Sequence, residues 1–182
     1  ALQAALDLVG GLVDVVGPAD LDRPTPCTEF TVRDLLSHLV AVTHRVAHMA
    51  GGGDPGDRRS LVTGVPDDAW PDAFRTGAAA LTAAWADDEV LGRTLIHPAG
   101  PMPAPFAGFA YVQELTAHAG DLAVAVDRED LLDEDLAEAA LASSRQFLPA
   151  EPRGGPVPFG PVVDVPADAP AHVRLAGWLG RG

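Results

Sequence analysis

Lysine and asparagine are absent from this chain of 182 residues, isoleucine occurs once, and Cys27 is the single cysteine. One cysteine excludes an internal disulfide bond, so nothing in the sequence requires an oxidising compartment and we expect a cytoplasmic protein. The missing lysine and asparagine, beside abundant alanine, glycine, proline and arginine, are typical of a GC-rich genome. This composition gives little information about the catalytic or binding chemistry of the protein.

Positive charge is also scarce, because 12 basic residues stand against 26 acidic ones and give a formal net charge of −14. Nucleic acids and anionic membranes are bound by clustered positive charge, so we expect neither as a partner. No apolar run approaches the roughly 18 residues that a membrane span needs. With 47% hydrophobic residues, the chain is long enough for one domain with a substantial core.

Apolar residues recur at helical spacing in several segments. We expect helices over residues 2–16, 32–49, 67–88, 107–130 and 133–147, and irregular chain over residues 91–106, with residues 93–96 briefly extended. Thr31, followed three residues later by Asp34, resembles a capping box and marks the start of the second helix. The pattern predicts an all-α fold, a helical bundle with long connections.

From Pro149 onward the composition changes, with seven prolines in 22 residues. Proline at this density excludes a helix, so residues 149–182 are expected to form an extended tail with a short terminal helix. We expect residues 1–148 to form the bundle and the tail to pack on it as part of the same domain. The expected anchors are apolar: Phe159, Val162, Val163, Val165, Leu175, Trp178 and Leu179.

The helix expected over residues 107–130 carries Glu114 and His118 four residues apart, with Asp121 one turn further on. Residues four apart lie on the same helix face, here at the edge of the apolar stripe. Burying such groups without a partner costs roughly 1–3 kcal/mol each. A metal ion, or a hydrogen bond to another helix, would supply that partner.

On the helix expected over residues 32–49, the same geometry directs His38 toward the core and His44 and His48 toward the opposite face. His38, Glu114 and His118 would then form a set of two histidines and one carboxylate. Three such ligands with an open fourth position suit a catalytic zinc ion, and the set also suits iron or nickel. From spacing alone, hydrogen bonds are the commoner arrangement for such side chains, so they stay an alternative to a metal site.

Three further side chains have two interpretations each. Asp121 could orient His118 as a partner behind the ligands, or be an exposed helix carboxylate. His97 could line the mouth of the site or lie in a surface loop. Cys27 could be a nucleophile, but no neighbour in sequence lowers its pKa, which favours a structural thiol.

Three segments together resemble a known family: TPCTEFTVRDLLSHLV (residues 25–40), ELTAHAGDLAVA (114–125) and FGPVVDVPADAPAHVRLAGWLGR (159–181). They resemble the actinobacterial metal-binding family related to the N-terminal domain of mycothiol-dependent maleylpyruvate isomerase, within the DinB/YfiT-like superfamily. The resemblance implies a four-helix bundle that holds a divalent metal through His38, Glu114 and His118. Gly120 departs from the family, since many relatives carry an aromatic residue before the aspartate.

The resemblance also implies a function. We expect a divalent metal, zinc first and otherwise nickel or iron, together with mycothiol, in a thiol transferase or isomerase acting on a small electrophile. The isomerase has an additional C-terminal domain for which this chain has no room, so turnover of maleylpyruvate itself is not expected. The alternatives are a metal-dependent hydrolase and a non-catalytic binding or regulatory bundle. A homodimer is compatible with the sequence but has no feature pointing to it.

Overall fold

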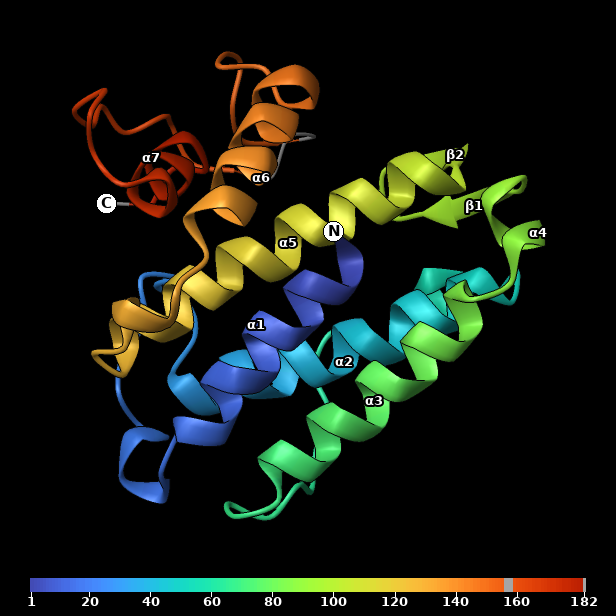
Figure 1. Ribbon diagram of the computed structural model, residues 1–182, viewed down its shortest axis with the longest axis horizontal. Helices are drawn as coiled ribbons and strands as arrows, with labels where there is room; N and C mark the ends of the chain where they lie inside the picture. Colours follow the sequence, from blue (N-terminus) through green and yellow to red (C-terminus); the bar gives the residue numbers. More distant parts are fainter. Residues whose placement is uncertain (156–158, 182) are drawn as a thin grey trace.

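The computed structural model describes residues 1–155 and 159–181 and is mostly helical (Figure 1). Within those residues, seven α-helices and three 3-10 helices accompany one two-stranded antiparallel sheet. In chain order these are α1 (Leu2–Val15), η1 (Pro18–Asp20), α2 (Val32–Ala50), η2 (Pro55–Asp57), α3 (Trp70–Trp85), α4 (Asp88–Leu91), β1 (Thr94–His97), β2 (Gly100–Pro103), α5 (Ala104–Ala125), η3 (Glu129–Leu131), α6 (Glu134–Phe147) and α7 (Ala171–Trp178). Among the described helices, none has both the length and the hydrophobicity needed to cross a membrane.

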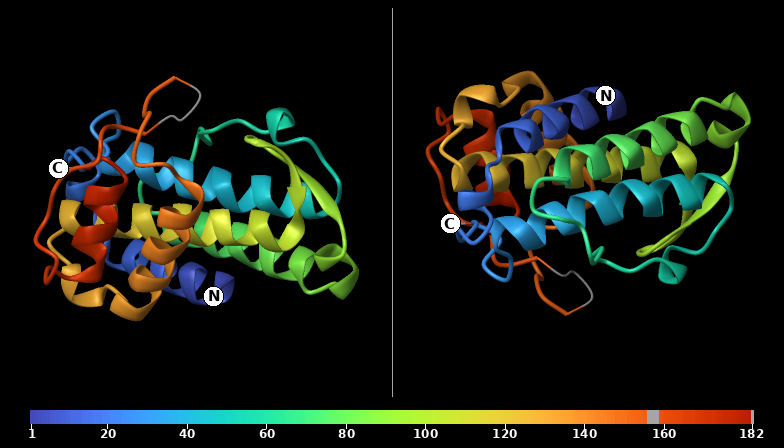
Figure 2. Two further views of the ribbon diagram at one scale, coloured as in Figure 1. Left: turned by 90° about the horizontal axis from the view of Figure 1, so that it is seen from above. Right: turned by 90° about the horizontal axis from the view of Figure 1, so that it is seen from below.

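Helices α1, α2, α3 and α5 build the main core. Helix α2 packs against α3 and α5, and α1 packs against α5 and α3, so these four helices lie side by side (Figure 2). Their facing sides bury large apolar residues, which include Leu12, Leu35, Leu36, Leu39, Phe74, Leu81, Leu115 and Leu122. The helical periodicity of the sequence therefore identified both the main helices and their buried faces.

The start of α2 is fixed by the expected capping box. The Asp34 carboxylate accepts a hydrogen bond from the Thr31 backbone N–H at 3.0 Å, and the Asp34 N–H donates to Thr31 Oγ1 at 3.3 Å. Two otherwise unpaired backbone donors are satisfied in this way. The helix consequently begins at Val32, and this sets which of its faces carries His38.

Several expected boundaries were wrong. The first strand, β1, confirms the brief extension expected over residues 93–96, but the rest of the segment expected to be irregular contains β2 and the start of α5. Helix α5 begins at Ala104, directly after the hairpin, instead of at residue 107. At its other end, α5 stops at Ala125 instead of residue 130, because Asp127 adopts a left-handed φ of 56°. The third helix is shorter than residues 67–88, since Asp87 caps the separate short helix α4.

Helix α3 approaches α2 closely at Gly77. A methyl carbon on Gly77 would lie 1.9 Å from Thr43 Oγ1 and 3.0 Å from Thr43 Cβ, and Thr43 is fully buried. Gly77→Ala is therefore expected to destabilise the protein by about 1–3 kcal/mol, despite the higher helix propensity of alanine. Urea unfolding measures this loss.

Gly11, on the exposed side of α1, is the matched control. A methyl group there meets nothing within 4 Å, so Gly11→Ala should stabilise the protein by about 0.5–1 kcal/mol through helix propensity alone. Equal stabilisation by both substitutions would contradict the close α2–α3 packing.

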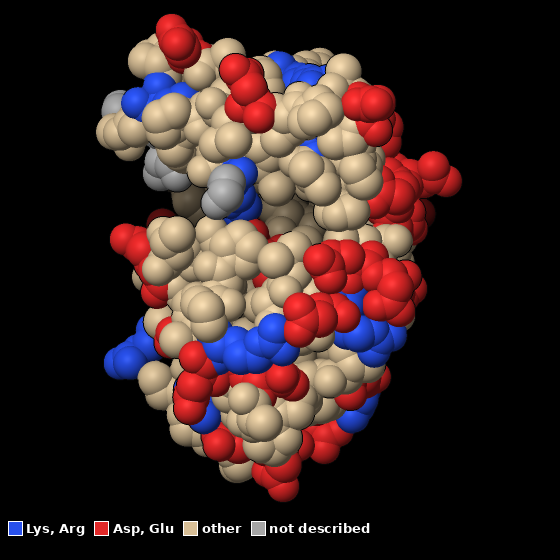
Figure 3. Space-filling view, turned by 90° about the vertical axis from the view of Figure 1, so that its left-hand side faces the viewer, with Lys and Arg blue, Asp and Glu red and all other residues tan. Residues whose placement is uncertain are grey.

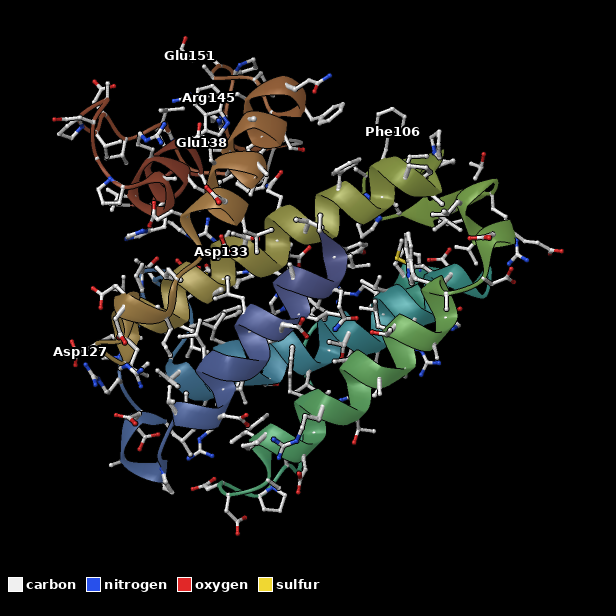
Figure 4. All side chains as sticks on the ribbon, viewed as in Figure 1. Phe106, Asp127, Asp133, Glu138, Arg145 and Glu151 are labelled. Carbon is white, nitrogen blue, oxygen red and sulfur yellow. The ribbon has the colours of Figure 1, made fainter. Side chains whose placement is uncertain are left out.

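The C-terminal segment packs across α5 beside α6 (Figure 2). As expected, Leu175 and Leu179 are buried, and Trp178 and Phe159 pack against the same apolar cluster. Val162, Val163 and Val165 are half-buried. Residues 156–158 and 182 of the expected tail lie outside the described residues. On the side of α6 that faces α7, Glu138 pairs with Arg174 (Figure 4).

The N-terminus of α7 is capped by Glu134 of α6. Its carboxylate accepts hydrogen bonds from the Ala171 N–H and from His172 Nδ1. Burial alone would raise the pKa of Glu134, but these hydrogen bonds outweigh it and leave that pKa below its ordinary value. A carboxylate at a helix N-terminus also interacts favourably with the helix dipole.

This contact predicts a pH-dependent stability. Because the folded-state pKa of Glu134 is lowered, its stabilising contribution is present above the ordinary glutamate pKa of about 4.3 and is lost as pH falls through the folded value. The unfolding free energies of wild type and Glu134→Gln should therefore differ at neutral pH and converge in acid. A difference that stays constant down to about pH 3 would contradict this role of Glu134.

Candidate metal centre

Helices α2 and α5 bring His38, Glu114 and His118 together. One ligand atom from each of the three lies within 4.8 Å of the others. His38 Nε2 is 3.1 Å from Glu114 Oε1, and the two imidazole rings meet edge-on with centroids 5.0 Å apart. The sequence placed these residues on the facing sides of two helices, and the fold joins them in one cluster.

Hydrogen bonds on the far side of each ring fix the histidine tautomers. His38 Nδ1 lies 3.0 Å from the Ser60 carbonyl oxygen, and His118 Nδ1 lies 3.0 Å from Asp121 Oδ2. A carbonyl or a carboxylate can only accept, so both Nδ1 atoms must carry the proton. Each ring is then left with Nε2 as its free lone pair, and that of His38 lies 3.1 Å from Glu114 Oε1. This is the arrangement that metal-binding histidines use.

The contact between His38 and Glu114 needs a positive charge. With Nδ1 as the donor to Ser60, His38 Nε2 and Glu114 Oε1 are both acceptors unless a proton or a cation lies between them. Burial would raise the pKa of Glu114, but the hydrogen bond to His38 and the charges of the two histidines and Arg45 outweigh it, and the pKa is lowered. An ionised carboxylate beside two imidazole nitrogens is a donor set that fits zinc, nickel or iron.

The cluster is partly open. The side chain of Glu114 is 30% exposed, whereas those of His38 and His118 are nearly buried. Three candidate ligands with one accessible side would leave a position for a fourth, exchangeable ligand.

Asp121 is not the exposed carboxylate that the sequence left open as an alternative. It is 2% exposed and accepts hydrogen bonds from His118 Nδ1 and from Arg181 Nε. Arg181 lies near the end of the chain, 60 residues away, so no local pattern links it to this site. Its contact with Asp121 was not predicted.

Cys27 lies closer to the cluster than its sequence context indicated. Its sulfur can approach His118 and Asp121 within 4.8 Å, which makes a second group of potential ligands that shares His118. Burial is the main cause that raises the pKa of the Cys27 thiol, and the charge of Asp121 adds to it. A thiol kept protonated is a poor nucleophile, which agrees with the structural interpretation of this residue.

His97 lines a cavity of about 490 Å3 together with Arg45 and Ser60. Its ring contacts Tyr111 of α5 with centroids 5.4 Å apart, and burial lowers its pKa. The cavity adjoins the cluster, because the Ser60 carbonyl accepts from His38. Of the two interpretations of His97, the structure therefore places it at the wall of a cavity beside the site.

The other histidines lie elsewhere. His44 is exposed on α2, His48 is 3.7 Å from Asp57, and His172 pairs with Glu134. Within the described residues, none of these three belongs to a group with metal-ligand spacing.

On the face shown in Figure 3, arginines are interspersed with carboxylates.

Comparison with known proteins identifies the family. A family model described as the mycothiol maleylpyruvate isomerase N-terminal domain matches residues 2–123. Two uncharacterized proteins from two strains of Mycobacterium tuberculosis are 32% identical to this chain over 186 residues, covering 100% of it and 96% of their own length.

The fold also matches solved structures. Crystal structures of the mycothiol-dependent maleylpyruvate isomerase and of a histidine-to-alanine variant align with a TM-score of 0.62, at 15% and 14% identity, over 78% of this chain. This chain spans only 64% of the length of that isomerase. The resemblance inferred from three sequence segments is thereby confirmed. The chain belongs to the mycothiol maleylpyruvate isomerase N-terminal domain family.

Proposed function

We propose that this protein is a DinB/YfiT-like four-helix bundle that binds one divalent metal ion, zinc first, through His38, Glu114 and His118. Residues 1–148 would form the metal-binding bundle, and residues 149–182 a tail that belongs to the same domain. The observation that carries the proposal is the orientation of the two histidines. Both donate from Nδ1 to protein acceptors, so both keep Nε2 free for a metal, and a ligand atom from each lies within 4.8 Å of the Glu114 carboxylate.

The proposed activity is a mycothiol-dependent transfer or isomerisation on a small electrophile. When bound, a divalent ion makes a coordinated thiol or water far more acidic. Ser60 and Asp121 hold the histidine rings in one orientation, and Glu114 supplies the negative ligand. The cavity lined by His97 and Arg45 would receive the part of the substrate beyond the reacting atom. The thiol is inferred from the family, because the isomerase that gives the family its description is mycothiol-dependent.

Cobalt substitution tests the thiol directly. Protein reconstituted with Co²⁺ and titrated with mycothiol should develop a near-ultraviolet sulfur-to-cobalt charge-transfer band. S-methyl mycothiol, which cannot form a thiolate, should not produce it. If Co²⁺ binds but no band appears with mycothiol, the thiol-dependent function is wrong, and a hydrolase that activates water becomes the better proposal.

A further inference from the structure

The C-terminal segment reaches the candidate metal centre through one side chain. Arg181 Nε donates to Asp121 Oδ1 at 2.8 Å and lies 2.9 Å from Asp121 Oδ2. The side chains of these two residues are 15% and 2% exposed, so the pair is largely shielded from water. Asp121 Oδ2 is also the acceptor for His118 Nδ1. Two contacts thus connect the end of the chain to a proposed metal ligand.

The backbone before Arg181 is held in a fixed direction. Gly180 has a φ of +79°, and a methyl carbon there would lie 2.7 Å from the Gly160 carbonyl oxygen. Only glycine tolerates both the positive φ and the close crossing of two chain segments. The Arg181 N–H then donates to the Ala176 carbonyl at 2.9 Å, which closes the last turn of α7. The guanidinium is therefore directed by the docking of α7.

Charge explains why this contact matters for His118. Burying a carboxylate as deeply as Asp121 costs free energy of folding unless a positive charge compensates it. Within the described residues, Arg181 is the guanidinium that pairs with it. With Arg181 in place, the Asp121 carboxylate is held in the position where it accepts the hydrogen bond from His118 Nδ1, so the orientation of the His118 ring depends on this pair.

We propose that Arg181 is a positioning residue of the metal centre, and that docking of the C-terminal segment and metal binding are coupled through the Arg181–Asp121–His118 contacts. This inference rests on the proposed metal site. Coupling between two binding equilibria is reciprocal. If docking of the segment tightens metal binding by a given factor, metal binding must lower the opening of the segment by the same factor.

The test compares Arg181→Gln with Arg174→Gln. Arg174 is the matched control, because it lies on the same segment but pairs with Glu138 on α6, away from the cluster. Zinc affinity, measured by chelator competition on the full chain, should fall about tenfold in Arg181→Gln. This is the lower end of the loss of metal affinity that follows when the hydrogen-bond partner of a metal ligand is disturbed. Arg174→Gln should stay within about twofold of wild type, and Arg181→Lys should recover part of the loss.

Two measurements test the positioning role of Arg181 by readouts other than zinc affinity and catalytic activity. In the metal-free protein, imidazole 15N shifts of His118 should report a proton on Nδ1 in wild type and a mixture of tautomers in Arg181→Gln. Amide exchange in α7 of the wild-type protein should slow on zinc binding. The factor should equal the ratio between the zinc affinities of wild type and Arg181→Gln.

The zinc affinities and the His118 tautomers decide between the possible outcomes. Unchanged zinc affinity in a folded Arg181→Gln, or in Arg181→Met if the first variant does not fold, would overturn the inference. If wild type binds no zinc, the proposed function fails. The His118 tautomer of the metal-free variants then still decides whether Arg181 positions that ring, and an unchanged tautomer rejects the positioning role.

Discussion

Replacing His118 with alanine should abolish stoichiometric zinc binding while the helical fold is retained. The substitution removes one of three proposed ligands, so the loss of affinity should exceed the roughly 10–100-fold that follows loss of a group behind a ligand. The fold should survive because Asp121 keeps its contact with Arg181. The measurement is the zinc-to-protein ratio after reconstitution and dialysis, with circular dichroism to verify helix content.

His44 supplies the control for this experiment. It is an exposed histidine on α2, the helix that also carries His38, and it lies outside the cluster. His44→Ala should bind zinc as wild type does. If His118→Ala keeps the wild-type ratio, the zinc is bound elsewhere and the three-residue site is wrong.

Replacing Asp121 with alanine should cause the largest loss of stability among single substitutions at the site. The substitution removes the partner of a shielded guanidinium and leaves His118 Nδ1–H without its acceptor. Breaking a buried ion pair from one side typically costs about 3–5 kcal/mol, because an uncompensated charge remains. Urea unfolding of the metal-free protein isolates this effect from metal binding.

An exposed ion pair gives the comparison. Asp14 of α1 pairs with Arg75 of α3 at 2.9 Å, and both side chains are more than half exposed. Exposed pairs of this kind contribute about 0–1 kcal/mol, so Asp14→Ala should change the unfolding free energy little. Similar losses in the two variants would show that burial does not strengthen the role of Asp121.

The sequence predicted the part of the site that depends on local periodicity. The spacing of Glu114 and His118 places both on one helix face, and the apolar pattern around His38 directs it inward. The capping box at Thr31 fixes where that helix begins. These features depend on residues within a few turns of one another, and for that reason they can be read without the fold.

The remaining partners depend on contacts between distant segments. Ser60 reaches His38 from a loop 22 residues away, and Arg181 reaches Asp121 from 60 residues away. Periodicity tells which face a residue occupies but not which loop covers that face. The end of α5 was missed for a related reason, since Asp127 takes a left-handed conformation that its neighbours do not indicate.

The most direct test of the account is anomalous diffraction at the zinc edge from crystals of the reconstituted wild-type protein. The proposed metal centre predicts one peak, at about 2.0–2.2 Å from His38 Nε2, His118 Nε2 and a Glu114 carboxylate oxygen. His118 Nδ1 should still donate to Asp121. A peak at other residues, or no peak while His38 Nε2 stays hydrogen-bonded to Glu114, would contradict the metal centre on which the proposed function depends.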